Sequence, residues 1–183
     1  ISVIYNYDGY GYGVFPIDSN NLDKIPEIKD EVARAYSYIN GYENTLIGKI
    51  IPSTAFNSCL KGIAVEQNEL IVKLMSNQLG TLFWDFLSTK QQVIAQAELE
   101  RLIYSRLQED LPSNIKKTLF SLFESIAYSE SGKEKLYQIW NKEIKIPNLK
   151  LNEDDFANMA MELAIYKHEK SGEILSKTRE SIS

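Results

Sequence analysis

The apolar residues at the start of the chain are spaced as in β-strands. Ile1 to Asn6 is rich in β-branched and aromatic residues, Asp8-Gly9 follows as a hairpin-type turn, and Tyr10 to Phe15 interleaves aromatic residues with glycine. Pro16 then interrupts the run, because proline cannot donate to a strand ladder. The pattern predicts a short β-hairpin, or the end of a preceding sheet domain, over residues 1–18.

Helical spacing takes over from about Pro26 onward, where apolar residues recur three and four positions apart. Gly41 is expected to end the first helix, and capping boxes at Ser131 with Glu134 and at Asn152 with Asp155 are expected to open two later ones. The successive apolar stripes cover residues 28–39, 56–63, 71–86, 99–107, 115–126, 131–140, 152–163 and 171–182.

Short links between these stripes favour antiparallel neighbours. The predicted fold class is therefore mainly α: an irregular α-helical array or superhelix of about eight antiparallel helices over residues 19–183, preceded by the short β-hairpin. The residues expected in its core include Ile115, Leu119, Phe123, Phe156 and Leu163.

Composition narrows the function classes. A net charge of -5 over 183 residues argues against a nucleic-acid partner, which usually requires a basic patch. No run of about 18 apolar residues suggests a membrane span. Position 1 is isoleucine inside a strand-like run, and the last residues lie within a helical pattern. Both ends are therefore expected to continue in a longer protein.

The residues that usually carry chemistry are scarce. A helical zinc peptidase site needs the motif H-E-x-x-H, but the chain contains one histidine, His168, which is expected at the surface. The single Cys59 lies in an apolar stripe, as a core residue would. Gly9, Gly11 and Gly13 follow the spacing G-x-G-x-G, which lacks the third glycine position of a dinucleotide-binding loop. We therefore predict no catalytic residue, no metal site and no cofactor within this chain.

Four residues are candidates for contacts with a substrate end or with another domain. Tyr10 and Tyr12 belong to a tyrosine-rich run, and clustered aromatic residues usually pack against something. Trp84 lies opposite the main apolar stripe of its helix, so it either serves the core of a neighbouring helix pair or contacts a further domain. Arg106 falls within an apolar stripe, so its charge needs an internal ion pair or an anionic ligand such as a peptide end.

Two segments resemble the aminopeptidase N family. Asn6-Tyr7-Asp8-Gly9-Tyr10-Gly11-Tyr12-Gly13-Val14-Phe15-Pro16-Ile17-Asp18 is similar to the place where the β-sandwich domain of such enzymes ends and their helical C-terminal domain begins. Glu31-Val32-Ala33-Arg34-Ala35 resembles the opening of the first helix of that domain. Weaker similarities follow at Gly48 to Pro52, Glu66 to Leu74 and Leu136 to Trp140.

The resemblance implies a zinc-dependent exopeptidase that removes N-terminal residues from peptides. It places zinc and the catalytic residues in another domain of the parent chain. This chain would then be a non-catalytic C-terminal domain that caps the substrate chamber, with the catalytic domain, the β-sandwich domain and the peptide substrate as its partners. Two alternatives stay open: a free-standing helical scaffold for a protein or peptide partner, and a regulatory helical domain with a small-molecule pocket.

Overall fold

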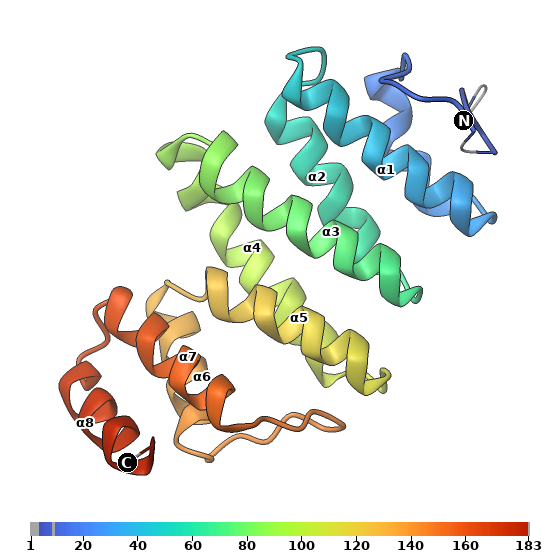
Figure 1. The fold of residues 1–183 in the computed structure, drawn as a ribbon. Coiled ribbons are helices and arrows are strands. Elements are labelled where there is room, and N and C mark those ends of the chain that lie inside the picture. Colours follow the sequence, from blue (N-terminus) through green and yellow to red (C-terminus); the bar gives the residue numbers. More distant parts are fainter. Residues whose placement is uncertain (1–3, 9, 183) are drawn as a thin grey trace. The chain divides into compact units, whose positions relative to one another are not determined.

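The computed structural model describes residues 4–8 and 10–182. The chain forms two compact units, residues 1–95 and residues 96–183, each with its own packed helices (Figure 1). Within the described residues the fold is mainly helical, and it contains eight α-helices, as the apolar periodicity predicts.

The first unit is a group of stacked helices. The 3₁₀-helix η1 (Ser19–Glu27) packs against α1 (Glu31–Leu46) and α2 (Pro52–Ile63), and α2 also packs against α3 (Glu69–Thr81). The π-helical turn η2 (Leu82–Phe86) continues α3, and α4 (Thr89–Gln108) then leads out of this unit. The core of this unit contains Leu22, Ile25, Phe56, Ile63, Met75, Leu79, Leu82 and Phe83.

The second unit is built from the rest of α4 and four further helices. These are α5 (Ser113–Ile126), α6 (Glu130–Trp140), α7 (Glu153–Ile165) and α8 (Ser171–Ile182). Helix α7 contacts α5, α6 and α8, so it is the central element of the unit. Four of the predicted core residues, Ile115, Leu119, Phe123 and Leu163, are buried, whereas Phe156 is half-buried.

The predicted N-terminal β-hairpin is wrong for the described residues of that segment, in which no strand forms. The parts of the prediction that concern residues 1–3 and Gly9 lie outside the described residues. Over the rest, asparagine side chains make the bonds that a second strand would make. The Asn6 side-chain amide donates to the Gly11 carbonyl and accepts from the Gly11 N–H. A Cβ at position 11 would lie 2.7 Å from the Phe15 ring, so only glycine allows this close approach.

Phe15 is held in the same way, by helix α1. The Phe15 N–H donates to the Asn40 side-chain oxygen at 2.9 Å, and the Phe15 carbonyl accepts from the side-chain amides of Asn40 and Asn44, both at 2.9 Å. Each hydrogen bond of this kind satisfies a backbone group that would otherwise need a partner strand or water. The segment is therefore extended and attached to α1 without belonging to a sheet.

Helix ends follow local rules, with two corrections to the sequence prediction. Helix α1 does not end at Gly41 but continues to Leu46, and Gly48, at a φ of 75°, closes it. The N–H of Gly48 donates to Thr45 and that of Lys49 to Asn44, the paired bonds of a Schellman motif. Helix α6 is capped by Ser129 and not by Ser131. The capping box predicted at Asn152 and Asp155 is confirmed.

Phe123 tests whether the core of the second unit is assigned correctly. Its ring is fully buried, and the centroids of the Phe123 and Tyr104 rings lie 5.5 Å apart. Phe123→Ala should therefore lower the free energy of unfolding by about 3–5 kcal/mol in chemical denaturation. Met161→Ala, at an exposed position of α7, is the control and should change it by less than about 0.5 kcal/mol. Equal effects of the two substitutions would contradict the assignment.

Candidate functional site

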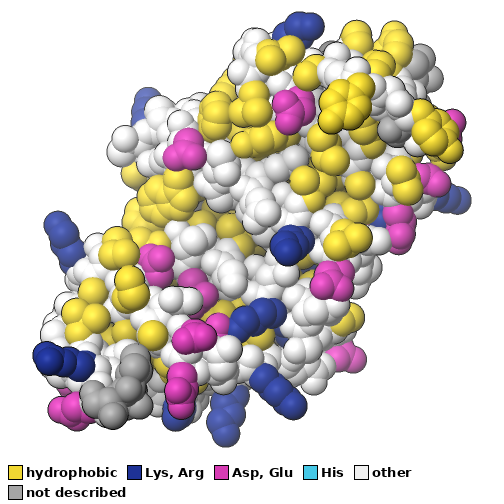
Figure 2. All heavy atoms as spheres, viewed as in Figure 1, with side chains coloured by type: hydrophobic (Ala, Val, Ile, Leu, Met, Phe, Trp, Pro, Cys, Tyr) yellow, Lys and Arg dark blue, Asp and Glu magenta, His cyan; other side chains and the backbone are white. Residues whose placement is uncertain are grey.

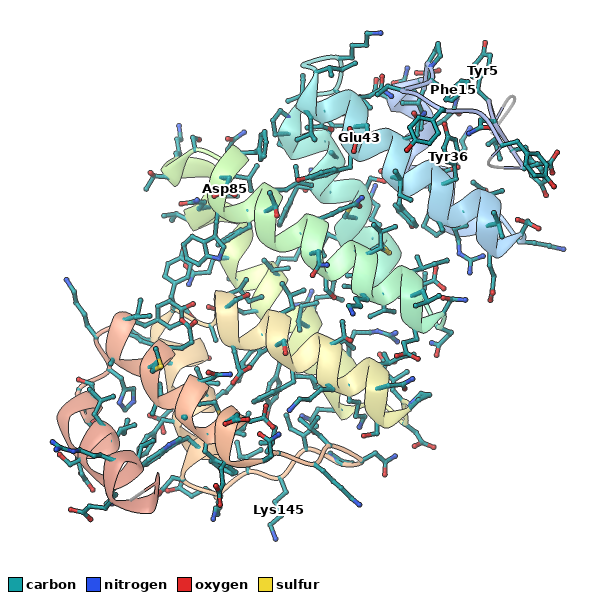
Figure 3. The ribbon with its side chains drawn as sticks, viewed as in Figure 1. Tyr5, Phe15, Tyr36, Glu43, Asp85 and Lys145 are labelled. Carbon is teal, nitrogen blue, oxygen red and sulfur yellow. The ribbon has the colours of Figure 1, made fainter. Side chains whose placement is uncertain are left out.

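The tyrosine segment, which we define as residues 4–15, carries the most exposed aromatic side chains of the first unit. Tyr10 and Tyr12 are 93% and 107% exposed relative to their reference areas, and Tyr5 and Tyr7 are about half exposed. Phe15 lies edge-on to Tyr36 of α1 with ring centroids 6.2 Å apart (Figure 3). The segment is thus anchored at Phe15, while its tyrosines face solvent.

Trp84 is also partly exposed, but it belongs to a different part of the unit. It lies in η2, is 41% exposed, and meets the ring of Phe83 edge-on at 5.0 Å. In Figure 3, η2, marked by Asp85, and the tyrosine segment, marked by Tyr5, lie at opposite ends of this unit. The structure therefore does not bring Trp84 together with Tyr10 and Tyr12 in one site.

Exposed apolar side chains are concentrated in the first unit. Figure 2 shows hydrophobic side chains at many places on the visible face of this unit. The exposed apolar residues of the unit include Val32 and Ile39 of α1, Leu70 of α3, and Val93 and Ile94 at the start of α4. In the second unit, by contrast, the exposed large hydrophobic side chains of the described residues are limited to Met161, Ile165 and Leu175. A large exposed apolar area rimmed by polar residues is typical of an interaction surface.

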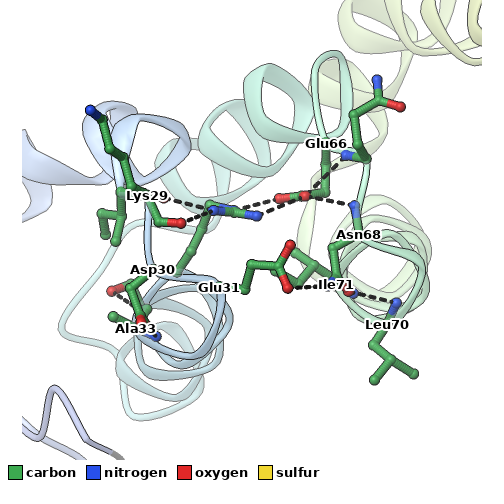
Figure 4. Close-up of polar contacts among 12 residues, drawn as sticks. Lys29, Asp30, Glu31, Ala33, Glu66, Asn68, Leu70 and Ile71 are labelled. Atoms are coloured by element: carbon green, nitrogen blue, oxygen red, sulfur yellow. Dashed lines mark hydrogen bonds and ion pairs between the residues drawn. The ribbon is translucent and has the colours of Figure 1, made fainter.

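A largely buried ion pair joins separate segments of the first unit, as Figure 4 shows. Arg34 of α1 donates from Nε to Glu66 Oε2 at 2.7 Å and from Nη2 to Glu66 Oε1 at 3.0 Å. Its Nη1 donates to the Ile28 carbonyl at 2.7 Å, and Glu66 also accepts from the N–H groups of Gln67 and Asn68. The pair joins the chain before α1 to the link between α2 and α3.

The charges of this pair stabilise one another. Burial alone would raise the pKa of Glu66, but the hydrogen bonds from Arg34, Asn68 and Gln67 outweigh it and lower that pKa below its usual range. The hydrogen bond with Glu66 raises the pKa of Arg34. Both groups therefore stay charged, and neither is available as an acid or a base near neutral pH.

Arg106, the fourth residue singled out from the sequence, lies in the second unit. Its side chain is 2% exposed, and its Nη1 pairs with Glu109 one turn later in the chain. The internal ion pair favoured by the apolar spacing is therefore present. Arg106 belongs to the second unit, whereas Tyr10, Tyr12 and Trp84 belong to the first.

The second unit contains a cluster of titratable groups that the sequence did not indicate. Glu124 of α5 is 8% exposed, and its Oε1 has no hydrogen-bond partner among the described residues. Burial, and then the nearby charge of Asp155, raise the pKa of Glu124 to about 8. Lys117 pairs with Asp155, and the Tyr166 hydroxyl donates to the Ser125 carbonyl at 2.7 Å. The surroundings of Glu124 therefore favour its protonated, neutral form.

His168 and Cys59 are both buried. His168, expected at the surface, instead stacks on Tyr137 with ring centroids 4.9 Å apart, and its Nδ1 accepts from the Lys170 N–H. Cys59 is in the core as predicted, and burial raises the pKa of its thiol to about 12. A thiol held in its protonated form is a weak nucleophile.

The described residues bring together no group of three or more His, Cys, Asp or Glu side chains that could hold a metal ion. Among the same residues, no helix combines the length and the apolar character needed to cross a membrane.

Comparison with models of known protein families, with curated proteins and with solved structures gave no match for this chain.

The Arg34–Glu66 pair should contribute measurably to stability. Removing one partner of a buried ion pair leaves the other charge unpaired, so Arg34→Met and Glu66→Gln should each lower the free energy of unfolding by about 3 kcal/mol. In the double variant the loss should be smaller than the sum of the two. Lys61→Met is the control, because the Lys61–Asp23 pair is more than half exposed and should contribute less than about 1 kcal/mol. Additive losses in urea denaturation would contradict the role given to the pair.

Glu124 should make stability depend on pH. Its folded pKa of about 8 lies above its usual 4.5, so the folded protein keeps a proton that the unfolded chain releases. Stability is therefore full at acidic pH and falls as the pH rises from about 4.5 to about 8. Glu124→Gln removes this loss, so its advantage over the wild type should grow by roughly 1 kcal/mol per pH unit in that window. A constant difference between pH 5 and pH 8 would contradict the assignment.

Proposed function

We propose that this chain is a non-catalytic helical domain of a zinc-dependent aminopeptidase of the aminopeptidase N type, where it caps the chamber that holds the peptide substrate. The observation that carries the proposal is the ordered resemblance of two segments, Asn6 to Asp18 and Glu31 to Ala35, to the start of that family's helical C-terminal domain. The mainly helical fold of the described residues supports it.

The contacts of these segments support a structural role for the resembling residues. Arg34, within the second segment, holds Glu66 and the Ile28 carbonyl. Within the first segment, the Asn6 side chain donates to the Gly11 carbonyl. The Phe15 N–H donates to Asn40 and so attaches the segment to α1. These residues fix the beginning of a helical domain, which is where the family resemblance places them.

Under this proposal, chemistry and recognition are divided between domains. Zinc and its H-E-x-x-H ligands belong to the catalytic domain of the parent chain, since one histidine cannot supply that motif. Tyr10, Tyr12 and Trp84, which are exposed, are available for contacts with the β-sandwich domain, the catalytic domain or the peptide.

A second function, from a different class, is favoured by the exposed apolar surface of the first unit. A free-standing helical scaffold would use that surface to bind a protein or peptide partner. The two functions differ in what the full reading frame encodes. The aminopeptidase requires an H-E-x-x-H motif upstream of Ile1, whereas the scaffold does not.

The zinc content and activity of two proteins test the proposal. The 183-residue chain alone should neither retain stoichiometric zinc nor hydrolyse aminoacyl reporter substrates, because its lone histidine cannot form the zinc site. The full-length protein should do both, and substitution of either histidine of its H-E-x-x-H motif should abolish both. A full-length protein without the motif, zinc or activity would overturn the proposal and favour the scaffold. Tightly bound zinc in the chain alone would overturn it as well.

A further inference from the structure

A groove on the second unit has the size and the lining of a small-molecule site. It has a volume of about 430 Å³ and is lined by residues from the end of α6, the start of α7 and the middle of α8. Binding pockets for small ligands usually measure roughly 300–1,000 Å³ and combine aromatic walls with a few polar groups. The lining residues are Trp140, Asn141, Lys142, Glu153, Phe156, Lys177 and Thr178.

The aromatic walls of the groove are accessible. Trp140 and Phe156 are both half-buried, although the apolar periodicity placed Phe156 in the core. One side of Trp140 stacks on Tyr137, with ring centroids 6.1 Å apart. The groove thus offers two aromatic surfaces on which a flat ring can pack.

Lys142 contributes a positive charge to the groove and has a backbone conformation that is unfavourable for lysine. It follows α6 with a φ of 63°, a left-handed conformation in which glycine is preferred. The N–H of Lys142 donates to Ile139 and that of Glu143 to Gln138, so the helix ends in a Schellman motif like the one that Gly48 closes after α1. With lysine at this position the folded protein is less stable than it would be with glycine. Lysine, unlike glycine, places a charged side chain in the groove.

The ammonium of Lys142 is available to an anion. It lies 5.2 Å from the centroid of the Phe156 ring, and among the described residues no carboxylate forms an ion pair with it. The other charged groups of the groove are accounted for. Lys177 pairs with Glu173 at 2.6 Å, and Glu153 lies in the first turn of α7, where the helix N-terminus favours a negative charge.

We propose that this groove binds a small molecule with an aromatic ring next to a carboxylate, the ring packing on Trp140 and the carboxylate pairing with Lys142. The aromatic walls select the ring, and the Lys142 ammonium beside Phe156 selects the anion. The limited volume favours a small acid over a long peptide. This inference does not depend on the proposed aminopeptidase function, because it rests only on the lining and the contacts of the groove.

The probe is 3-phenylpropanoate, titrated into the ¹⁵N-labelled chain at low salt. The chain has two tryptophans, so the indole N–H signal of Trp140 reports the groove while that of Trp84 serves as an internal control. We expect a saturable shift of the Trp140 signal with a dissociation constant on the order of 1 mM, and no saturable shift for Trp84. The uncharged 3-phenylpropanamide and the ringless propanoate should each bind about 5-fold more weakly or worse.

Two matched variants separate binding from folding. Lys142→Gly should raise the melting temperature, because glycine adopts the left-handed conformation without strain, and should weaken 3-phenylpropanoate binding by about 5-fold. Lys167→Gly changes a lysine at the equivalent position after α7, where φ is 56°, and should raise the melting temperature without changing affinity.

Two results would overturn the proposal. The first is the absence of a saturable Trp140 shift. The second is binding that is equally strong for the acid and its amide and unaffected by Lys142→Gly.

Discussion

The ion pair between Arg34 and the buried Glu66 carboxylate links the parts of the first unit. A buried carboxylate needs partners, and Glu66 finds one in the partly buried Arg34 guanidinium, which also donates to the Ile28 carbonyl. Glu66 in turn accepts from the N–H of Asn68, the residue whose side chain caps α3. The turn before α1, the link after α2 and the start of α3 are therefore joined by one network.

The sequence predicted the parts of the fold that depend on local spacing. Apolar stripes gave the eight α-helices, and the capping box at Asn152 and Asp155 gave the start of α7, because both signals lie within a few residues. Gly41 was misread as a helix end because its role is not local. A Cβ there would lie 3.1 Å from the Leu22 side chain, so glycine allows η1 to pack closely against α1.

The candidate site was predictable only where exposure could be inferred from composition. The tyrosine-rich run indicated exposed aromatic residues, and Tyr10 and Tyr12 are exposed. The expected hairpin does not form among the described residues, because asparagine side-chain amides bond backbone groups that a partner strand would otherwise bond. One of them belongs to Asn40, which lies 25 positions from Phe15. Glu66 lies 32 positions from Arg34, and no periodic pattern links such residues. Their partnership appears only when the helices have packed.

The two units differ in where they place polar groups, and this difference suits different tasks. The first unit contains one largely buried ion pair, Arg34–Glu66, and leaves many aliphatic and aromatic side chains in solvent. The second unit buries charged or titratable side chains, Lys116, Glu124 and His168, and exposes few large hydrophobic ones among its described residues. The proposed contact with a protein or a neighbouring domain would therefore use the first unit. The pH dependence expected from Glu124 and the proposed binding of a small anion both concern the second unit.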